Sequence, residues 1–405
     1  MTTHDDRRVT TDGSRTVTAD GGRSLALEVA DLTHQYDTER ALNSVSFGVE
    51  PGELVALLGP SGCGKTTLVQ AIAGHIDPTA GRVRLRGDDV TDAPPESRHV
   101  GLVFQQSTLY PHMTVGENVA YGLTACGTEW ARRDGRVAEY LDLVDLRAQA
   151  DESPEALSGG QRRRVELARA LAPEPDVLLL DEPLSALDRT LRDRLRDEID
   201  RIQRETDVAT LFVTHDQADA MALADRLVVL DGGSISAVGE PRALYESPPT
   251  PFLASFLGRS NRLRARVVDA DSSADAAADE PRDICLDNRT IDRCENRARF
   301  QPGDTVVCHV RPEVLTLQVD PDGSDATSEP TDTDGPPRSI TLSGTVRRVR
   351  DVGTRYDVTV RTAEGATLTA EQATDPPAVG DAVTVRFPPS ALTVFPDDSV
   401  EDSGR

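Results

Sequence analysis

Short apolar runs alternate with helical patterns over the larger, N-terminal part of the chain. The runs at 53–59, 176–182 and 209–216 are nearly continuous in apolar side chains, which is typical of strands buried on both faces of a sheet. Between the first two, residues 130–146 place apolar side chains at helical intervals, and this pattern predicts a helical insert. We therefore expect a layered α/β domain over residues 24–258.

The pattern changes after Gly258, where short strand-like runs are separated by turn residues. Such runs begin at residues 263, 305, 314, 344 and 356. They predict a small all-β barrel or sandwich over residues 259–396. The polar stretches at 270–283 and 320–338, rich in Asp, Ser, Pro and Gly, predict loops or disordered insertions.

The two ends of the chain lack such patterns. Residues 1–23 are polar and have no apolar core of a signal peptide, so they predict a disordered tail. Residues 397–405 predict a short acidic tail. Because eighteen apolar residues never run together, we expect that the chain does not cross a membrane alone.

The predicted β-domain contains a weak internal similarity. Residues 302–318 align without gaps to residues 379–395, with six identical positions that include a Gly-Asp pair. Either a duplication or a shared strand-like composition explains this similarity.

A glycine-rich turn follows the apolar run at 53–59. The stretch GPSGCGKTTL contains Lys65, which is the only lysine in a chain with 44 basic side chains. Glycines at this spacing let successive backbone N–H groups point at a phosphate, and the following helix adds its dipole. A lysine reaches the β- and γ-phosphates as a compact charge, which the larger fork of arginine does not reproduce. We expect a phosphate loop made of Gly59, Pro60, Ser61, Gly62, Cys63, Gly64, Lys65, Thr66 and Thr67.

Two acids, Asp181 and Glu182, end the apolar run at 176–182. The carboxyl end of a buried strand is where nucleotide sites form in open α/β sheets. Thr66 and Asp181 offer oxygen ligands to Mg²⁺, and Glu182 is placed to polarise an attacking water. Cys63, at a variable position of the loop, is expected to pack rather than to do redox chemistry.

The stretch LSGGQRRRVELARAL at 157–171 completes this set of motifs. Together they resemble the nucleotide-binding subunit of an ATP-binding-cassette (ABC) transporter. The resemblance covers residues 25–395 and implies a P-loop NTPase domain with a helical subdomain, which hydrolyses ATP with Mg²⁺. The helix after Gly160 is expected to turn four apolar side chains inward, namely Val165, Leu167, Ala168 and Leu171.

The resemblance also implies roles for single residues. Tyr36 should stack on adenine, and Gln105 should touch the metal and sense the permease. The implied metal ligands are Thr66, Gln105 and Asp181, and the implied catalytic side chains are Glu182, His215 and Gln105. The residues implied to act across a subunit boundary, on the phosphate loop of a second copy or a homologue, are Ser158, Gly159, Gly160, Gln161 and Asp188.

Two further stretches narrow the implied subclass. Residues 108–123 and 310–317 are similar to importer ATPases with a C-terminal regulatory barrel of the OB-like, TOBE type. This group serves sugars, polyamines, ferric iron and oxyanions. The resemblance implies a peripheral protein on the cytoplasmic face of the membrane, bound to two integral-membrane permease subunits and indirectly to an extracytoplasmic solute-binding protein.

Charge separates the remaining alternatives. Acidic side chains outnumber basic ones, 69 to 44, for a formal net charge of −25, which disfavours nucleic acid as a partner. The alternative of a soluble ABC-type ATPase that acts on nucleic acid or ribosomes is therefore less favoured, and the C-terminal barrel disfavours an exporter. The acid excess favours a protein kept soluble in a salty cytosol, as in halophiles, over the bias of a high-GC genome. The five cysteines show no metal-binding spacing.

Overall fold

A computed structural model describes residues 25–125, 127, 129–185, 187–268, 283–286, 289–291, 300–301, 303–319 and 339–397. This part of the chain forms two compact units, which divide between Leu244 and Tyr245. The predicted tail at 1–23, the predicted tail at 397–405 apart from its first residue, and most of the two predicted polar insertions lie outside these residues.

The division lies earlier than the predicted boundary at Gly258. Residues 245–258 group with the second unit. The guanidinium of Arg311 explains this grouping, because it lies 4.1 Å from the ring centroid of Tyr245 and donates hydrogen bonds to the carbonyls of Tyr245 and Ala254. Sequence patterning finds a change of periodicity, whereas this boundary depends on contacts between distant residues.

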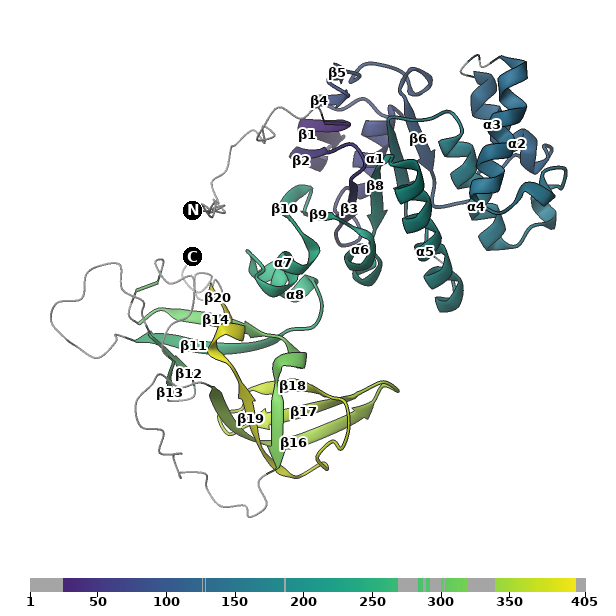
Figure 1. Ribbon diagram of the computed structural model, residues 1–405. Coiled ribbons are helices and arrows are strands. Elements are labelled where there is room, and N and C mark those ends of the chain that lie inside the picture. The colour runs from purple at the N-terminus through teal and green to yellow at the C-terminus, as the bar shows by residue number, and fades with distance from the viewer. Residues whose placement is uncertain are drawn as a thin grey trace, which may run out of the picture. The chain divides into compact units, whose positions relative to one another are not determined.

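The first unit is built around a six-stranded sheet with the order β10-β9-β3-β8-β7-β6 (Figure 1). Its strands are β3 (Leu54–Leu58), β6 (Val100–Val103), β7 (Val177–Asp181), β8 (Ala209–Thr214), β9 (Arg226–Asp231) and β10 (Ser234–Gly239). All neighbours run parallel except β9 and β10. Every residue of β3, β7 and β8 is buried, which confirms the three strands predicted from continuous apolar runs.

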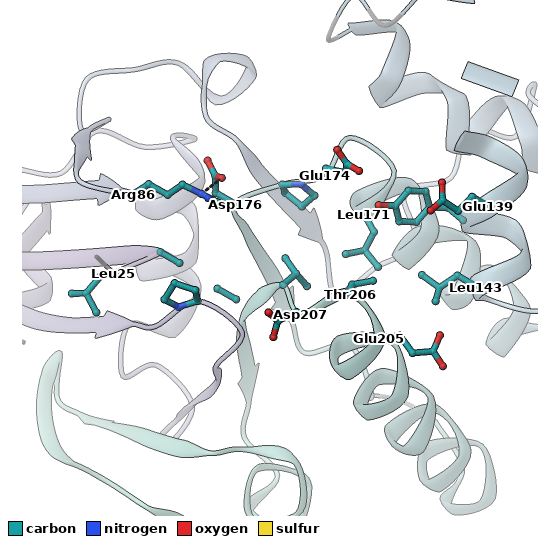
Figure 2. A pocket seen from close by; sticks show the side chains of 16 residues that line it. Leu25, Arg86, Glu139, Leu143, Leu171, Glu174, Asp176, Glu205, Thr206 and Asp207 are labelled. Atoms are coloured by element: carbon teal, nitrogen blue, oxygen red, sulfur yellow. Dashed lines mark ion pairs between the residues drawn. The ribbon is translucent and has the colours of Figure 1, made fainter. Parts of the chain in front are cut away.

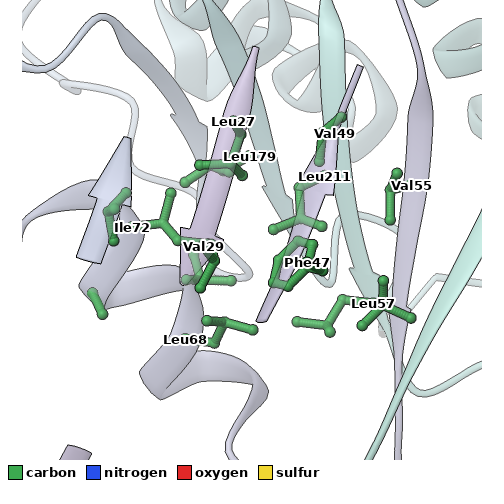
Figure 3. Packing of buried hydrophobic residues seen from close by; sticks show 14 of the residues in the cluster. Leu27, Val29, Phe47, Val49, Val55, Leu57, Leu68, Ile72, Leu179 and Leu211 are labelled. Carbon is green, nitrogen blue, oxygen red and sulfur yellow. The ribbon is translucent and has the colours of Figure 1, made fainter. Parts of the chain in front are cut away.

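A second, antiparallel sheet in this unit has the order β2-β1-β4-β5. Its strands are β1 (Leu27–Tyr36), β2 (Glu39–Val49), β4 (Ala80–Leu85) and β5 (Asp88–Asp89). The two sheets and helix α1 (Lys65–Ala73) share one apolar core (Figure 3). Phe47 and Val29 of the antiparallel sheet belong to this core together with Leu57, Leu179 and Leu211 of the large sheet. The core therefore fixes the strand ends from which the candidate site is built.

The predicted helical insert is present. Helices α2 (Val115–Ala125), α3 (Trp130–Leu143) and α4 (Gly159–Leu171) pack on one another between β6 and β7 along the chain. The remaining helices of the first unit are α5 (Arg189–Thr206), α6 (Gln217–Leu223) and α7 (Pro241–Glu246), with 3₁₀ turns η1 (Pro95–Ser97), η2 (Arg147–Gln149) and η3 (Pro154–Ala156). Helix α7 continues two residues past the division between the units.

The second unit contains helix α8 (Pro251–Phe256) and two five-stranded sheets, with orders β13-β12-β11-β14-β20 and β15-β19-β16-β17-β18. The strands are β11 (Asn261–Val268), β12 (Asp283–Leu286), β13 (Arg289–Ile291), β14 (Thr305–Val310), β15 (Thr316–Val319), β16 (Ile340–Asp351), β17 (Tyr356–Thr362), β18 (Thr367–Gln372), β19 (Ala382–Phe387) and β20 (Thr393–Pro396). Each of the five predicted strand runs overlaps one of them, and the two sheets contribute to a single apolar core.

The weak internal similarity corresponds to a structural repeat. Residues 305–319 form a strand, the 3₁₀ turn η4 (Pro312–Val314) and a strand, and residues 382–396 repeat this with η5 (Pro389–Ala391). Val306 pairs with Pro396, and Val383 pairs with Val319. These two pairs are equivalent, because the alignment of residue 302 with residue 379 matches Val306 to Val383 and Val319 to Pro396. The two sheet orders also correspond strand for strand when one of them is read in reverse. In this match β15 and β20 are exchanged, so that each pairs with a strand of the other repeat. This arrangement favours duplication over chance similarity.

Candidate nucleotide site

The phosphate loop joins β3 to α1, and its glycines are required by the backbone. Gly62 and Gly64 have φ values of 81° and 102°, in the left-handed region that favours glycine. A Cβ atom on Gly59 would lie 2.5 Å from the carbonyl oxygen of Leu230, and one on Gly64 would lie 2.4 Å from that of Ala41. The loop therefore packs tightly on its neighbours through positions where a side chain cannot fit.

Lys65 begins α1 and is only 7% exposed. Its Nζ donates hydrogen bonds to the carbonyls of Gly59 over 2.7 Å and Pro60 over 3.0 Å. The Sγ atom of Cys63 lies 4.0 Å from Nζ, and burial raises the pKa of this thiol. Cys63 belongs to the apolar core, which confirms the prediction that it packs. Ser61, Gly62 and Thr66 are exposed, and Thr67 is half-buried.

Asp181 and Glu182 lie at the carboxyl end of β7. Asp181 is 9% exposed, and its burial, with a smaller contribution from the charge of Glu182, raises its carboxyl pKa above the usual range. The ammonium of Lys65 opposes this shift. Glu182 has a φ of 47°, which is uncommon outside glycine, and its N–H donates to the carbonyl of Val213 over 2.9 Å. The backbone at this acid is therefore held by the neighbouring strand β8.

Three sequence-predicted catalytic residues meet at Glu182. Gln105 follows β6, and its Nε2 donates to Glu182 Oε2 over 2.8 Å. His215 follows β8, and its Nδ1 lies 3.0 Å from Glu182 Oε1. Because an ionised carboxylate can only accept, Nδ1 carries the proton in this contact. Parallel strands that end at one edge of the sheet bring these three side chains together.

The residue after His215 is fixed by a network of its own. Asp216 caps α6 by accepting from the N–H groups of Ala218 over 2.9 Å and Asp219 over 3.2 Å. Its other carboxylate oxygen accepts from Arg192 of α5 over 2.6 Å. His215 is therefore held between the end of β8 and a capped helix start.

The LSGGQ stretch forms the start of α4. The Ser158 side chain accepts from the N–H of Gln161 over 3.3 Å, and the Gln161 side chain accepts from the N–H of Ser158 over 2.9 Å, which is a capping box. Gly159 is exposed, and a Cβ on Gly160 would lie 2.7 Å from a methyl carbon of Leu191. The four side chains expected to turn inward, Val165, Leu167, Ala168 and Leu171, are all buried.

The remaining predicted site residues lie at the ends of other elements. Asp188 caps α5 by accepting from the N–H of Leu191 over 3.0 Å. Tyr36, at the end of β1, is 46% exposed, and its ring meets that of His34 edge-on at 4.4 Å. Between the described residues of the LSGGQ stretch and those of the phosphate loop, the structure has no hydrogen bond.

Sequence reasoning missed a buried ion pair, Arg163 with Glu166 on α4, whose arginine bonds to the carbonyls of Phe104 and Pro183. The run of three arginines from Arg162 to Arg164 gave no signal that the middle one is buried. A buried residue on α4 is expected to be apolar, so only tertiary contacts identify these two.

A cavity of about 670 Å³ opens at the amino ends of the strands of the large sheet (Figure 2). It lies where β7 and β8 begin, whereas the site residues lie where these strands end. Its acidic lining residues are Glu139, Glu174, Asp176, Glu205 and Asp207, and Arg86 pairs with Asp176. Five carboxylates repel a polyphosphate, so the strand-end cluster is a better candidate for the nucleotide site than this cavity.

Comparison with known proteins identifies the family of the chain. The sequence profile of the ABC transporter family matches residues 42–185, and that of the TOBE domain matches residues 308–395. The spermidine/putrescine import ATP-binding protein PotA of Acidothermus cellulolyticus is 42% identical, over 82% of this chain and 80% of its own length. The chain belongs to the family of ATP-binding subunits of ABC importers.

Other relatives of this ABC importer subunit are named for the import of different solutes. The Fe(3+) ions import ATP-binding protein FbpC 1 of Rhizobium meliloti is 38% identical over 85% of this chain and 90% of its own length. The sulfate/thiosulfate import ATP-binding protein CysA of Bordetella bronchiseptica is 50% identical over 60% of this chain and 70% of its own length. The importer subunit is an ATPase that powers solute import.

A solved structure shares the ATPase fold of the importer subunit. It is cbiO1 from Clostridium perfringens, part of the ABC transporter complex cbiONQ, with 27% identity and a TM-score of 0.51 over 55% of this chain and 91% of that one. Among the residues that the structure describes, no helix is both long and apolar enough to span a membrane.

Proposed function

We propose that Glu182 is the general base of ATP hydrolysis in this importer subunit. The observation that carries the proposal is the double contact of its carboxylate, with Gln105 on one oxygen and His215 on the other. A carboxylate held in this way can accept a proton from a water that attacks the γ-phosphate. His215 then keeps the carboxylate oriented through Nδ1, and its Nε2 donates to an oxygen of the γ-phosphate when the ring carries a second proton.

The phosphates bind where the loop glycines and the start of α1 present backbone N–H groups. The exposed residues Ser61, Gly62 and Thr66 leave this surface open to a ligand. Lys65 exchanges its bonds to two loop carbonyls for bonds to phosphate oxygens, which are stronger because both partners are charged. Tyr36, half-exposed at the end of β1, stacks on the adenine.

The donor set fits Mg²⁺. The Thr66 hydroxyl, the Gln105 amide oxygen and the Asp181 carboxylate are hard oxygen ligands of the kind that this ion prefers. When bound, the ion neutralises charge on the phosphates. A dication held beside Asp181 would offset the burial cost of its carboxylate.

A second copy of the chain completes each site. Ser158 and Gly159 are exposed at the start of a capped helix, where N–H groups can meet a γ-phosphate. Gly160, Gln161 and Asp188 contribute to the same boundary. Two copies arranged head to tail then hold two nucleotides, each between the phosphate loop of one copy and the LSGGQ stretch of the other.

The wider assembly contains two integral-membrane permease subunits, on whose cytoplasmic side the ATPase lies, and an extracytoplasmic solute-binding protein. Aromatic side chains beside the loop of Gln105 support a permease contact, since Phe104 is 36% exposed and Tyr121 is 46% exposed. The solute comes from the sugar, polyamine, ferric-iron and oxyanion group. The acidic surface suits a salty cytosol and not a nucleic-acid partner.

Glu182→Gln tests the role of the proposed base. The amide keeps the shape of the side chain but cannot accept the proton, so ATP binding should persist while kcat falls by about 10² or more. The measurement is steady-state hydrolysis beside equilibrium binding of ATP. The matched control, Glu96→Gln at an exposed position of η1, should hydrolyse ATP at the parental rate. A parental rate in Glu182→Gln would remove Glu182 from this role.

A further inference from the structure

Arg163 lies buried on α4 and reaches the backbone on both sides of the proposed catalytic contact. Its Nε donates to the carbonyl of Pro183 over 3.0 Å, and its Nη1 donates to the carbonyl of Phe104 over 2.5 Å. Pro183 directly follows Glu182, and Phe104 directly precedes Gln105. One guanidinium therefore holds the chain next to each partner of the Gln105–Glu182 hydrogen bond.

Glu166, one turn later on α4, is 2% exposed and completes the arrangement. Its Oε2 accepts from Arg163 Nη1 over 2.7 Å, and its Oε1 accepts from the N–H of Thr108 over 2.9 Å. Arg169, also on α4, donates to the carbonyl of Thr108 over 2.7 Å. The helix thus binds the loop of Gln105 at Phe104 and again at Thr108.

Stability alone does not explain this pair. Burying two charges costs desolvation energy, and well-packed apolar side chains of similar size often stabilise a protein as much or more. What the charges add is direction, because an arginine fork can hold two carbonyls at fixed angles. Both carbonyls that Arg163 holds belong to residues adjacent to the site, at Phe104 and Pro183.

We propose that Arg163 and Glu166 are positioning residues for ATP hydrolysis, which hold Gln105 and Glu182 in register with α4. The proposal rests on the role proposed for Glu182. Because α4 begins at Gly159, in the stretch proposed to meet the nucleotide of a second copy, a displacement of this helix start is transmitted through the buried pair to the general base.

The double variant Arg163→Met/Glu166→Leu tests the proposal without leaving a lone buried charge. We expect kcat to fall by about 10-fold to 100-fold, because the base is misplaced, while KM for ATP stays within about twofold. The thermal unfolding midpoint should fall, because the carbonyls of Phe104 and Pro183 and the N–H of Thr108 lose these partners, but the variant should remain folded at the assay temperature. Parental kcat in a variant that is folded at the assay temperature would overturn the proposal.

Single substitutions keep the test decisive if the double variant folds poorly. Arg163→Lys retains the charge but cannot span both carbonyls, so kcat should fall with little change in KM. The matched control is Arg164→Lys on the same helix, since Arg164 donates to the carbonyl of Val144 in the helical insert, and kcat should stay parental. Equal kcat values for the two lysine variants would count against a positioning role.

A double-mutant cycle separates this proposal from that of the base. In the Glu182→Gln background, the Arg163→Met/Glu166→Leu change should not lower the residual turnover further, because the pair acts through Glu182. A further fall in turnover by the factor seen in the parental background would show that the pair does not act through Glu182. By contrast, a parental rate for Glu182→Gln alone would refute the base assignment.

Discussion

The ammonium of Lys65 donates a hydrogen bond to the carbonyl oxygen of Gly59, 2.7 Å away, in a loop that also buries the lysine. Lys65 is the only lysine, so an amine-selective reagent has two targets, this side chain and the N-terminal amine. Because the ammonium is already covered, we expect Lys65 to react more slowly than the N-terminal amine without nucleotide. Bound Mg-ATP should slow it further, as measured by site-resolved mass spectrometry.

The N-terminal amine is the internal reference, and its labelling should not respond to nucleotide. Labelled Lys65 should no longer support ATP binding. Lys65→Arg should impair binding as severely as Lys65→Ala, because the planar fork does not act as a compact charge in this loop. Equal labelling of Lys65 with and without bound Mg-ATP would mean that the lysine does not face the phosphates.

ATP should drive association of two copies, because one chain supplies only half of each proposed site. With ATP, the Glu182→Gln protein should scatter light as a dimer, and without nucleotide as a monomer or a weaker dimer, at high salt. Adding Lys65→Ala, which should abolish ATP binding, is the matched control and should remove the ATP effect. A monomer of Glu182→Gln under all conditions would point to a homologous partner chain in place of a second copy.

His309 should make the second unit sensitive to acid. It is 3% exposed, and burial, helped by the charges of Arg262 and Arg311, lowers its imidazole pKa from 6.5 to about 4. A depressed histidine pKa contributes stability that is present above 6.5 and is lost as pH falls from 6.5 to about 4. This loss is about 2 kcal/mol by pH 5 and about 3 kcal/mol by pH 4.

In the His309→Gln variant this loss should be absent, although Ser260, 3.0 Å from His309 Nδ1, remains as a partner. The measurement is the unfolding free energy of parent and variant at pH 7, 5 and 4, since the effects of other titrating groups cancel in the difference. The exposed His99→Gln serves as control and should follow the parent. Parallel loss of stability in parent and His309→Gln would contradict the prediction.

The second unit should regulate and not catalyse, because the residues of the site lie in the first unit. A chain that ends after Glu246, and so keeps α7 whole, should retain ATP binding and basal hydrolysis. A chain that ends at Gly258 should do the same but be less soluble, because α8 loses Arg311, which bonds to Ala254. Loss of ATP binding in a folded, soluble chain ending after Glu246 would show that the second unit is needed for the site.

The sequence predicted local features well because they depend on neighbours within a few residues. Gly62 and Gly64 have the positive φ values of a tight loop, which are a property of the local backbone. Ser158 and Gln161 form their capping box within one helical turn. Continuous apolar runs likewise predict buried parallel strands, and β3, β7 and β8 follow them closely. The identity of the candidate site residues was therefore available without a structure.

Only the tertiary structure decided which side chains meet and which are enclosed. Gln105 and Glu182 come together because β6 and β7 are neighbours in the sheet, and strand order depends on the whole core. The three successive arginines from Arg162 have the same local chemistry. Of the three, Arg163 holds the backbone beside both Gln105 and Glu182. Its direction on α4 is set by what the helix packs against. The bonds of Lys65 to carbonyls of its own loop depend on how that loop folds back on the lysine. The pairing of β15 and β20 in the second unit depends on contacts between residues distant in the chain. Periodicity encodes neither.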